Sequence, residues 1–452
     1  MSRRAARALL LVTLAAFAWA PTRAGAQGMD TFGMGSRSTS LGGAVTADVS
    51  DFSAAFYNPA GIVRDGRLEL SVGYFRVAPD LEIDGRDSNV DPVGGTVFGL
   101  NVPGRFGDFR FAFGIGGHLP DARISRTRSL PRQQPRWEMY DNRPHRTYLA
   151  ANMAIRPFDW LLVGGGIAFM ATSNNQLEAR GNLDLSSPEG GSRVEHQVAF
   201  DLTAIRYPQF GLQVTPNEQW SFGAVYRGQY ALGSDLTAEV VADITGVGDP
   251  IPAYLYLETS SINTFNPQQV SVGASWRPVP SLRIGVDVTW VDWSDYRSPI
   301  GKSDVILTID VPPDLADLID VPDSIDSTDF VPAKFNDRFI PRIGIEATLV
   351  EDEDLSFTGR LGYFFESTPV PDQVGLTNLI DNHRHALSAG VGLSLEGLEP
   401  LISGGLTLDA HFQWSIIPER TIQKASLVDS IGDYRARGQL FGAGATVGLE
   451  FE

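Results

Sequence analysis

Alternating apolar and polar residues run through much of the chain and predict β-strands. In the segment 282–290, leucine, isoleucine, valine and tryptophan occupy every second position, with arginine, glycine, aspartate and threonine between them. Successive side chains of a strand point to opposite faces, so this segment has one apolar and one polar, charged face. The alternation recurs at 343–349 and 355–365. It fits a barrel wall between an aqueous lumen and lipid, although a soluble β-sandwich shows the same pattern.

The connections between these segments alternate between short and long. Short connections rich in turn-forming residues are expected at 103–108, 156–159, 215–218, 277–280 and 351–354. Long connections are expected at 78–93, 119–145, 174–200, 232–263, 294–337, 366–383 and 417–435. Outer-membrane barrels join their strands by tight periplasmic turns and larger external loops. We therefore predict an all-β protein, a transmembrane antiparallel β-barrel of about 14 strands.

The first 26 residues have the features of a secretory signal peptide. Arginines at positions 3, 4 and 7 precede an apolar stretch from Ala8 to Ala20, and small residues lead up to Gln27. We expect the mature chain to be exported and to start at Gln27. No later segment supplies the roughly 20 apolar residues that a spanning helix needs. A tilted strand needs only about 10 residues, so export and strand pattern together favour the barrel over the sandwich.

Charge and the last segment narrow the range of partners. The formal net charge is −18, and it becomes more negative when the arginines of the signal peptide are removed. Nucleic acid is a poor partner for such a surface. The final strand is expected over Gly438 to Phe451. An aromatic residue near the C-terminus, here Phe451, is the feature that the outer-membrane barrel assembly machinery is expected to recognise.

Three separated blocks resemble the FadL/TodX family of outer-membrane hydrocarbon transporters. The first is GMGSRSTSLGGAVTADVSDFSAAFYNPAGI, residues 33–62, which is similar to the N-terminal plug, or hatch, of that family. The second runs from Asn266-Pro267-Gln268-Gln269 to a Trp-x-Asp-Trp-Ser signature at 290–294. The third combines TPVPD at 368–372 with Asp381-Asn382-His383-Arg384 and LSAG at 387–390, where Ile380 replaces a proline common in the family.

The resemblance implies a division into a signal peptide at 1–26, a hatch inside the lumen at 27–64 and a barrel with long external loops at 65–452. In the family the Asn-Pro-Ala triplet closes the plug, which assigns the gate to Asn58, Pro59, Ala60 and Gly61. Outside that context the same residues would be a simple turn. Candidate ligand-contacting residues are four aromatic and four cationic side chains: Phe32, Phe52, Phe56, Tyr57, Arg227, Arg283, Arg342 and Arg360.

The arginines have two readings, as a network with lumen acids or as sites that capture a substrate carboxylate. Gly42, Gly43 and Gly61 flank the Asn-Pro-Ala turn and are candidate hinges. His383 and His385 lack a third ligand, so no metal site is assigned. Ser388 and His385 are predicted on opposite strand faces. His411 and Ser415 share a face without an evident oxyanion device, so no catalytic residue is assigned.

The function implied by the resemblance is passive uptake of long-chain fatty acids or of aromatic or aliphatic hydrocarbons through a hatch-gated barrel. The protein is then a monomer without a cofactor in the outer membrane of a Gram-negative bacterium, in contact with lipid and lipopolysaccharide. The alternatives are a general polar-solute porin, a lipid-modifying outer-membrane enzyme and an adhesin. The substrate, the direction of release and the role of the acidic insert at 303–329 are left open by the sequence.

Overall fold

The computed structural model describes residues 29–121, 134–141, 147–184, 193–245, 251–296, 302–309, 324–325, 333–398, 404–425 and 431–451. The predicted signal peptide, Gln27 and most of the acidic insert lie outside these residues.

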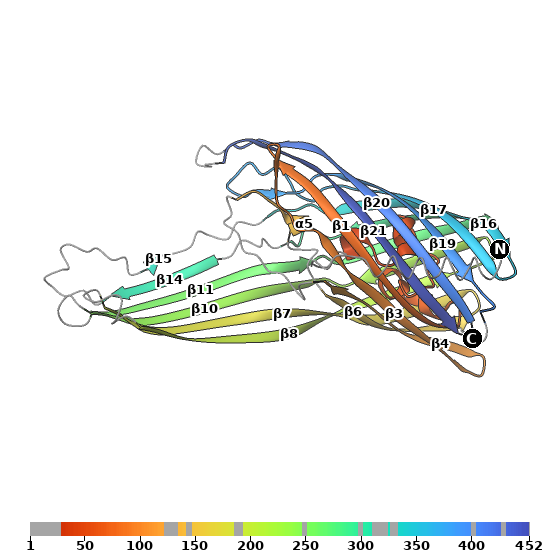
Figure 1. Cartoon of the computed structure of the whole chain (residues 1–452), viewed down its shortest axis with the longest axis horizontal. Coiled ribbons are helices and arrows are strands. Elements are labelled where there is room, and N and C mark those ends of the chain that lie inside the picture. Colours follow the sequence, from red (N-terminus) through yellow and green to blue (C-terminus); the bar gives the residue numbers. More distant parts are fainter. Residues whose placement is uncertain are drawn as a thin grey trace.

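Fourteen antiparallel strands form a closed barrel (Figure 1), which confirms the predicted fold class. Each strand pairs with the next one along the chain, and β1 pairs with β21 to close the ring. The strands are β1 (Leu68–Ile83), β3 (Val93–Phe106), β4 (Phe109–Pro120), β6 (Tyr148–Phe158), β7 (Leu161–Asp184), β8 (Arg193–Val214), β9 (Trp220–Arg227), β12 (Gln269–Val279), β13 (Leu282–Val291), β16 (Arg338–Asp352), β17 (Leu355–Glu366), β19 (Arg384–Leu395), β20 (Gly404–Ile422) and β21 (Tyr434–Phe451). Closure removes the unpaired edges of an open sheet.

The two faces of the wall follow the sequence alternation. In β13, Arg283, Asp287 and Thr289 are buried, whereas Val286 and Val288 are 48% and 38% exposed on the outside. Leu361 on β17 is 61% exposed on the same outer surface. Exposing apolar area to water costs about 25 cal/mol per Å². The outer surface is therefore suited to lipid, and the polar side chains point into the lumen.

Tight turns lie at one end of the barrel, which we call the turn end, and the longer connections lie at the loop end. Outward aromatic side chains gather near the turn end. The rings of Phe158 and Trp160 stack with centroids 5.6 Å apart, and those of Trp220 and Trp276 stack at 5.8 Å. Aromatic girdles of this kind border the apolar band of membrane barrels. Among the described residues, no helix combines the length and apolar character needed to cross a membrane.

A sheet projects beyond the loop end (Figure 1). β7 and β8 have 24 and 22 residues, about twice the ~10 residues needed to cross a bilayer. Beyond the rim, β7 pairs in parallel with β10 (Tyr230–Thr245), and the sheet continues through β11 (Ile251–Asn266), β14 (Lys302–Ile309) and β15 (Ser324–Ile325). The chain thus passes from β9, beside β8, to β10, beside β7. At the crossing, Gly228 N donates to Pro208 O at 2.8 Å, and the rings of Tyr207 and Tyr230 lie 4.9 Å apart.

The projecting sheet corrects two predicted loops, because much of 174–200 and 232–263 forms strands. Polar runs such as Asn174-Asn175-Gln176 lack the apolar alternation of the membrane-facing strands. A sheet in water requires only that its backbone groups are paired, so it can form without that signal.

The N-terminal segment, residues 29–63, lies inside the barrel (Figure 1). We call it the lumen segment. It contains the short helices α2 (Met29–Phe32), α3 (Ser36–Ser40) and α4 (Ala54–Tyr57) and the 3₁₀ helix η1 (Pro59–Val63). Nearly all of its residues are buried. α3 packs against β17, β19, β20 and β21, and η1 packs against β3, β4, β6, β7 and β8.

Short elements lie at the loop end of the barrel. β5 (Arg136–Trp137) pairs with β18 (Leu379–Ile380), α5 (Glu138–Asp141) follows β5, and β2 (Arg86–Asp87) pairs with β1. Beside them Trp293, Tyr296 and Phe335 form a buried aromatic cluster, in which the rings of Tyr296 and Phe335 stack with centroids 4.3 Å apart. These groups belong to the connections that follow β13 and precede β16.

Candidate functional site

Asn58 joins the lumen segment to the barrel wall through its side chain. Its backbone is extended, with φ −161°, and Pro59 begins η1 directly after it. Asn58 Oδ1 accepts a hydrogen bond from Ala60 N at 3.1 Å, which caps the helix. Asn58 Nδ2 donates to Thr46 O at 2.7 Å and to Leu212 O on β8 at 3.0 Å. Because the side chain is fully buried and every bond is internal, this asparagine fixes the Asn-Pro-Ala turn against β8.

Inward-facing glycines of the wall make room for the backbone of the lumen segment. A β-carbon at Gly164 of β7 would overlap the backbone of Pro59, and one at Gly223 of β9 would overlap Thr46 O. On β17, a β-carbon at Gly362 would overlap Gly42 N. The segment therefore lies directly on the wall at several strands, a close approach that only glycine permits.

The candidate hinge glycines are themselves confined. Gly42 and Gly43 have φ of 63° and 76°, which disfavours any other residue, and Gly42 lies against the backbone of Tyr363. Gly61 has no room for a β-carbon, because it would overlap Val49 O. In the arrangement described here these three glycines serve turns and close packing.

Ion pairs connect the lumen segment to the wall. In some the segment supplies the acid and in others it supplies the cation. Asp48 of the segment pairs with Arg283 of β13 at 2.5 Å, and Arg277 and Ser275 also donate to Asp48 Oδ2. Burial by itself raises the pKa of Asp48, but the charge of Arg283 and the hydrogen bonds it donates outweigh burial and hold that pKa well below its usual range. In the opposite sense, Arg37 of the segment pairs with Glu346 of β16 at 2.9 Å. Thr46 N also donates to Asp287 Oδ2 at 2.9 Å.

Three of the candidate residues, Arg283, Arg360 and Phe52, are engaged by neighbouring residues and do not line the cavity between α2 and the wall. Arg283 is committed to Asp48, and Arg360 bridges Glu346 at 2.7 Å and Asp409 at 2.5 Å. Phe52 packs against Gly99 of the wall, and its backbone N–H donates to Glu69 Oε1 at 3.0 Å. All three side chains are at least nine-tenths buried. Both arginines therefore belong to a network with lumen acids, the first of the two roles considered for them.

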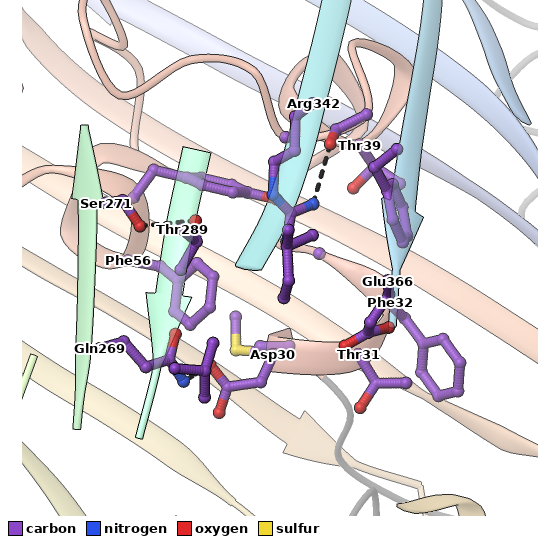
Figure 2. A pocket seen from close by; sticks show the side chains of 18 of the residues that line it. Asp30, Thr31, Phe32, Thr39, Phe56, Gln269, Ser271, Thr289, Arg342 and Glu366 are labelled. Atoms are coloured by element: carbon purple, nitrogen blue, oxygen red, sulfur yellow. Dashed lines mark hydrogen bonds between the residues drawn. The ribbon is translucent and has the colours of Figure 1, made fainter. Parts of the chain in front are cut away.

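A small cavity lies between α2 and the wall (Figure 2). Several of its lining residues stand at the loop ends of their strands, so the cavity lies on the side of the lumen segment that faces the loop end. Its volume is about 40 Å³. Five candidate residues line it: Phe32, Phe56, Tyr57, Arg227 and Arg342. The rings of Phe56 and Tyr57 meet edge to face with centroids 5.0 Å apart. The lumen segment therefore lines the cavity with aromatic side chains, and the barrel strands line it with arginines.

Arg227 of β9 and Arg342 of β16 differ from the other candidate arginines, because neither forms an ion pair within the part of the chain that the structure describes. Arg227 donates to Phe56 O at 3.2 Å and to Gln269 Oε1 at 2.9 Å, and its guanidinium lies 4.3 Å from the centre of the Phe56 ring. Arg342 donates to Gly42 O at 2.9 Å and lies over Phe364. Both cations therefore face the cavity with only neutral partners.

Other residues of the cavity were not among the sequence-based candidates. Asp30 of α2 accepts a hydrogen bond from Gln269 Nε2 at 3.3 Å, and Figure 2 shows both side chains at the cavity. Glu366 of β17 forms ion pairs with both Arg338 and Arg384. The sequence offers one signal for these cavity residues. Gln269 belongs to the second family-like block, and Arg384, the partner of Glu366, belongs to the third.

The second and third family-like blocks both lie at the loop end of the barrel. Gln268 Nε2 of the second block donates to Asp292 Oδ2 at 2.7 Å, within the Trp-x-Asp-Trp-Ser signature. In the third block, Asn382 Nδ2 donates to Pro418 O and Ala436 O, and Arg384 reaches Glu366. The third block thus joins segments that are far apart in the sequence.

The histidines and serines considered for other chemistry are dispersed. His383 Nδ1 accepts from Thr368 N at 3.1 Å, and His385 Nδ1 bonds Tyr363 Oη at 2.9 Å. Ser388 Oγ accepts from Gln413 Nε2 at 3.0 Å on the lumen face, opposite His385. Among the described residues, no group of three or more His, Asp or Glu side chains is placed to hold a metal ion.

Comparison with known proteins gives matches over most of the chain. No family model matches it. Alkane uptake protein A of Marinobacter nauticus is 23% identical over 403 residues, which cover 84% of this chain and 81% of that protein.

The fold matches solved structures. A FadL homologue of Pseudomonas aeruginosa matches with a TM-score of 0.54, 14% identity and coverage of 92% of this chain and 97% of that one. The P. putida toluene transporter TodX matches with a TM-score of 0.51, 14% identity and coverage of 93% and 99%. The CymD monoaromatic hydrocarbon channel matches with a TM-score of 0.51, 15% identity and coverage of 93% and 98%. The chain therefore shares its barrel fold with these FadL- and TodX-type structures, and it is similar in sequence to a curated uptake protein over most of its length.

Proposed function

We propose that the protein is an outer-membrane transporter for passive uptake of hydrophobic molecules, with residues 27–64 as the hatch that gates it. The observation that carries this proposal is the lumen segment itself, which occupies the barrel and leaves a cavity of about 40 Å³ beside Phe32, Phe56 and Tyr57. A buried water needs ~10–15 Å³, so this space holds only a few waters. A wide aqueous pore for polar solutes is a poor fit to such a lumen.

Transport requires the hatch to move. Ligand pockets commonly span about 300–1,000 Å³, far more than the cavity described here. We place the moving part at α2, because it borders the cavity and Gly33 and Gly35 follow it with φ of 89° and 76°. Residues 40–62 remain seated on the wall through Asn58, Asp48 and the wall glycines. A hydrophobic molecule would enter where α2 gives way and leave toward the turn end, down its own gradient.

The cavity supports two substrate classes that share an apolar body. The aromatic walls suit an alkane, as taken up by the relative from M. nauticus, or a monoaromatic hydrocarbon. Arg227 and Arg342 have no carboxylate partner among the described residues, so they also suit the carboxylate of a long-chain fatty acid. The other candidate arginines, Arg283 and Arg360, are already paired with lumen acids.

The test compares uptake of radiolabelled palmitate and hexadecane in cells that lack other routes. Replacing Arg227 and Arg342 by glutamine should lower palmitate uptake by about tenfold or more, because even one lost charge-assisted contact is worth ~1.5–3 kcal/mol, and should leave hexadecane uptake unchanged. Arg437→Gln is the control, because this arginine is exposed and pairs with Glu82 on the outside of the loop end. Equal loss for both substrates would assign the two arginines to the structure rather than to selection.

The hatch itself is tested by deleting residues 27–60. The strands satisfy their own backbone groups, so the barrel should still fold, but it should become a leaky pore without substrate preference. Unchanged preference after this deletion would refute the gate at Asn58, Pro59, Ala60 and Gly61.

The proposal includes the setting of the protein. We place the turn end in the periplasm and the loop end with its projecting sheet outside the cell, among lipopolysaccharide. The protein would be a monomer inserted by the barrel assembly machinery. Faster migration on gels before heating, and recovery in the outer-membrane fraction, are the expected results. Recovery in the inner membrane contradicts the proposal.

An enzymatic role in lipid modification is the rival hypothesis. The relatives are named as an uptake protein, a transporter and a channel. Replacing His385, Ser388, His411 and Ser415 together by alanine should leave uptake and folding unaffected. A lipase activity in the unaltered protein that disappears in this variant would support the rival.

A further inference from the structure

A second hollow lies on the outer surface of the wall. It has a volume of about 450 Å³ and is bordered by residues of β16, β17, β19 and β20: Ile343, Ile345, Leu361, Gly362, Tyr363, Leu387, Ser388, Ala389, Phe412 and Trp414. Leu361 and Phe412 are 61% and 49% exposed, so the hollow belongs to the lipid-facing surface rather than to the lumen.

Strand register explains why the surface is depressed here. Ala389 lies directly between Leu361 of β17 and Phe412 of β20. Its methyl group forms a low floor between two large side chains. In the next outward row toward the turn end, Ala347 pairs with Gly359, and the Leu349 side chain lies over Gly359, so the depression ends before this row.

The loop end of the hollow has a polar border. Tyr363 Oη bonds His385 Nδ1 at 2.9 Å, and Trp414 Nε1 donates to Gln439 Oε1 at 3.3 Å. Tyrosine and tryptophan favour the level where the apolar interior of a membrane meets its head groups. The hollow therefore runs from this level into the apolar band.

Nothing reaches the hollow from inside, because the wall is backed by the lumen segment. Gly344, Gly362 and Gly390 face inward on the same strands, and a β-carbon at each would overlap or crowd Leu41, Gly42 or Ser40. The backbone groups of β17, β19 and β20 are paired along the hollow, so a peptide strand cannot add there. The occupant must be apolar and must approach through the membrane.

We propose that this hollow binds one acyl chain of a membrane lipid, with the head group of the lipid at the level of Tyr363 and His385. The hollow opens on the apolar outer surface of the wall, which suits lipid. Its volume lies within the ~300–1,000 Å³ range of small-molecule pockets. Between lipid and protein there is no hydrophobic driving force, so the chain is held by close packing against Leu361, Phe412 and Trp414. This site is independent of the proposed gate.

The test is native mass spectrometry of the full-length mature protein, extracted in a mild detergent and washed repeatedly. The wild type should retain one lipid. Ala389→Leu, which fills the floor of the hollow, should retain about tenfold less, because roughly ten atomic contacts are lost. Ala151→Leu is the matched control on the outer face of β6 and should retain as much as the wild type. All three proteins should show the same heat-dependent gel mobility.

Equal retention of lipid by the wild type and Ala389→Leu would overturn the proposal. So would a retained mass that corresponds to a transported hydrocarbon or to a second copy of the chain. Ala389→Gly provides a further check, because it deepens the hollow without adding atoms and should keep the lipid. Loss of lipid in Ala389→Gly to the extent seen in Ala389→Leu would also contradict the assignment.

Discussion

Arg283 of β13 holds Asp48 of the lumen segment through two charge-assisted hydrogen bonds, from Nε to Oδ2 at 2.7 Å and from Nη2 to Oδ1 at 2.5 Å. Arg283 Nη2 also donates to Ala44 O. Both side chains are buried, so each charge depends on the other for its stability. The pair therefore ties the lumen segment to one strand of the barrel.

Arg283→Gln should loosen this attachment without unfolding the barrel. Removing one partner of a buried pair commonly costs ~3–5 kcal/mol, because the remaining charge is left uncompensated. Arg277 and Ser275 still contact Asp48, so we expect the lower end, ~3 kcal/mol. Protease cleavage within residues 29–63 reports the release. The double variant Asp48→Asn with Arg283→Gln should recover part of the protection. A double variant as sensitive as the single one would show that the pair carries no coupling.

The same pair predicts how the attachment depends on pH. The pKa of Asp48 is held below its usual value of 3.8. A carboxyl with a lowered folded-state pKa stabilises the folded form above its unfolded pKa and loses that contribution as the pH falls. The contribution of Asp48 to the stability of the attachment should therefore be constant between neutral pH and about pH 5. It should weaken only below about pH 4. In Asp48→Asn this acid-dependent step should shrink, and an unchanged step would assign it to another group.

Asn58→Ala should weaken the attachment of the Asn-Pro-Ala turn to the barrel wall. The substitution removes the donors to Thr46 O and Leu212 O and the cap on Ala60 N. Leaving buried backbone acceptors unsatisfied costs ~1–3 kcal/mol each. We expect altered hydrophobic uptake and a raised ion conductance in planar bilayers, with heat-dependent gel mobility unchanged. Pro59→Ala alone should have a smaller effect, since Pro59 contributes stiffness and no hydrogen bond. Wild-type conductance in Asn58→Ala would contradict this account.

Gly223→Ala should displace the lumen segment by steric overlap alone. Its β-carbon would collide with Thr46 O and Ala47 Cα, which are backbone atoms without freedom to turn aside. Gly359→Ala is the matched control, because its β-carbon meets only the Leu349 side chain. Overpacking of this kind costs ~1–3 kcal/mol. Protease sensitivity of residues 29–63 should rise in Gly223→Ala and stay constant in Gly359→Ala. Equal behaviour of the two variants would show that the segment does not rest on Gly223.

The sequence by itself determined the class of fold and the lipid-facing surface. A strand shows its two faces through a period of two residues, and that signal is local: Arg283, Asp287 and Thr289 could be placed in the lumen from their spacing alone. The Asn-Pro-Ala turn was likewise visible, because proline and asparagine restrict the backbone within a few residues. The projecting sheet escaped prediction because strands outside the membrane need no apolar face.

Only the tertiary structure decided which lumen residues are engaged and which face the cavity. Arg37 and Glu346 are 309 positions apart, and Asp48 and Arg283 are 235 apart. Their pairing follows from closure of the barrel and from the register of its strands, neither of which a local pattern contains. In the sequence Arg227, Arg283, Arg342 and Arg360 look alike. Closure gives carboxylate partners to Arg283 and Arg360 and leaves Arg227 and Arg342 at the cavity, because charge compensation depends on distance in space and not on separation along the chain.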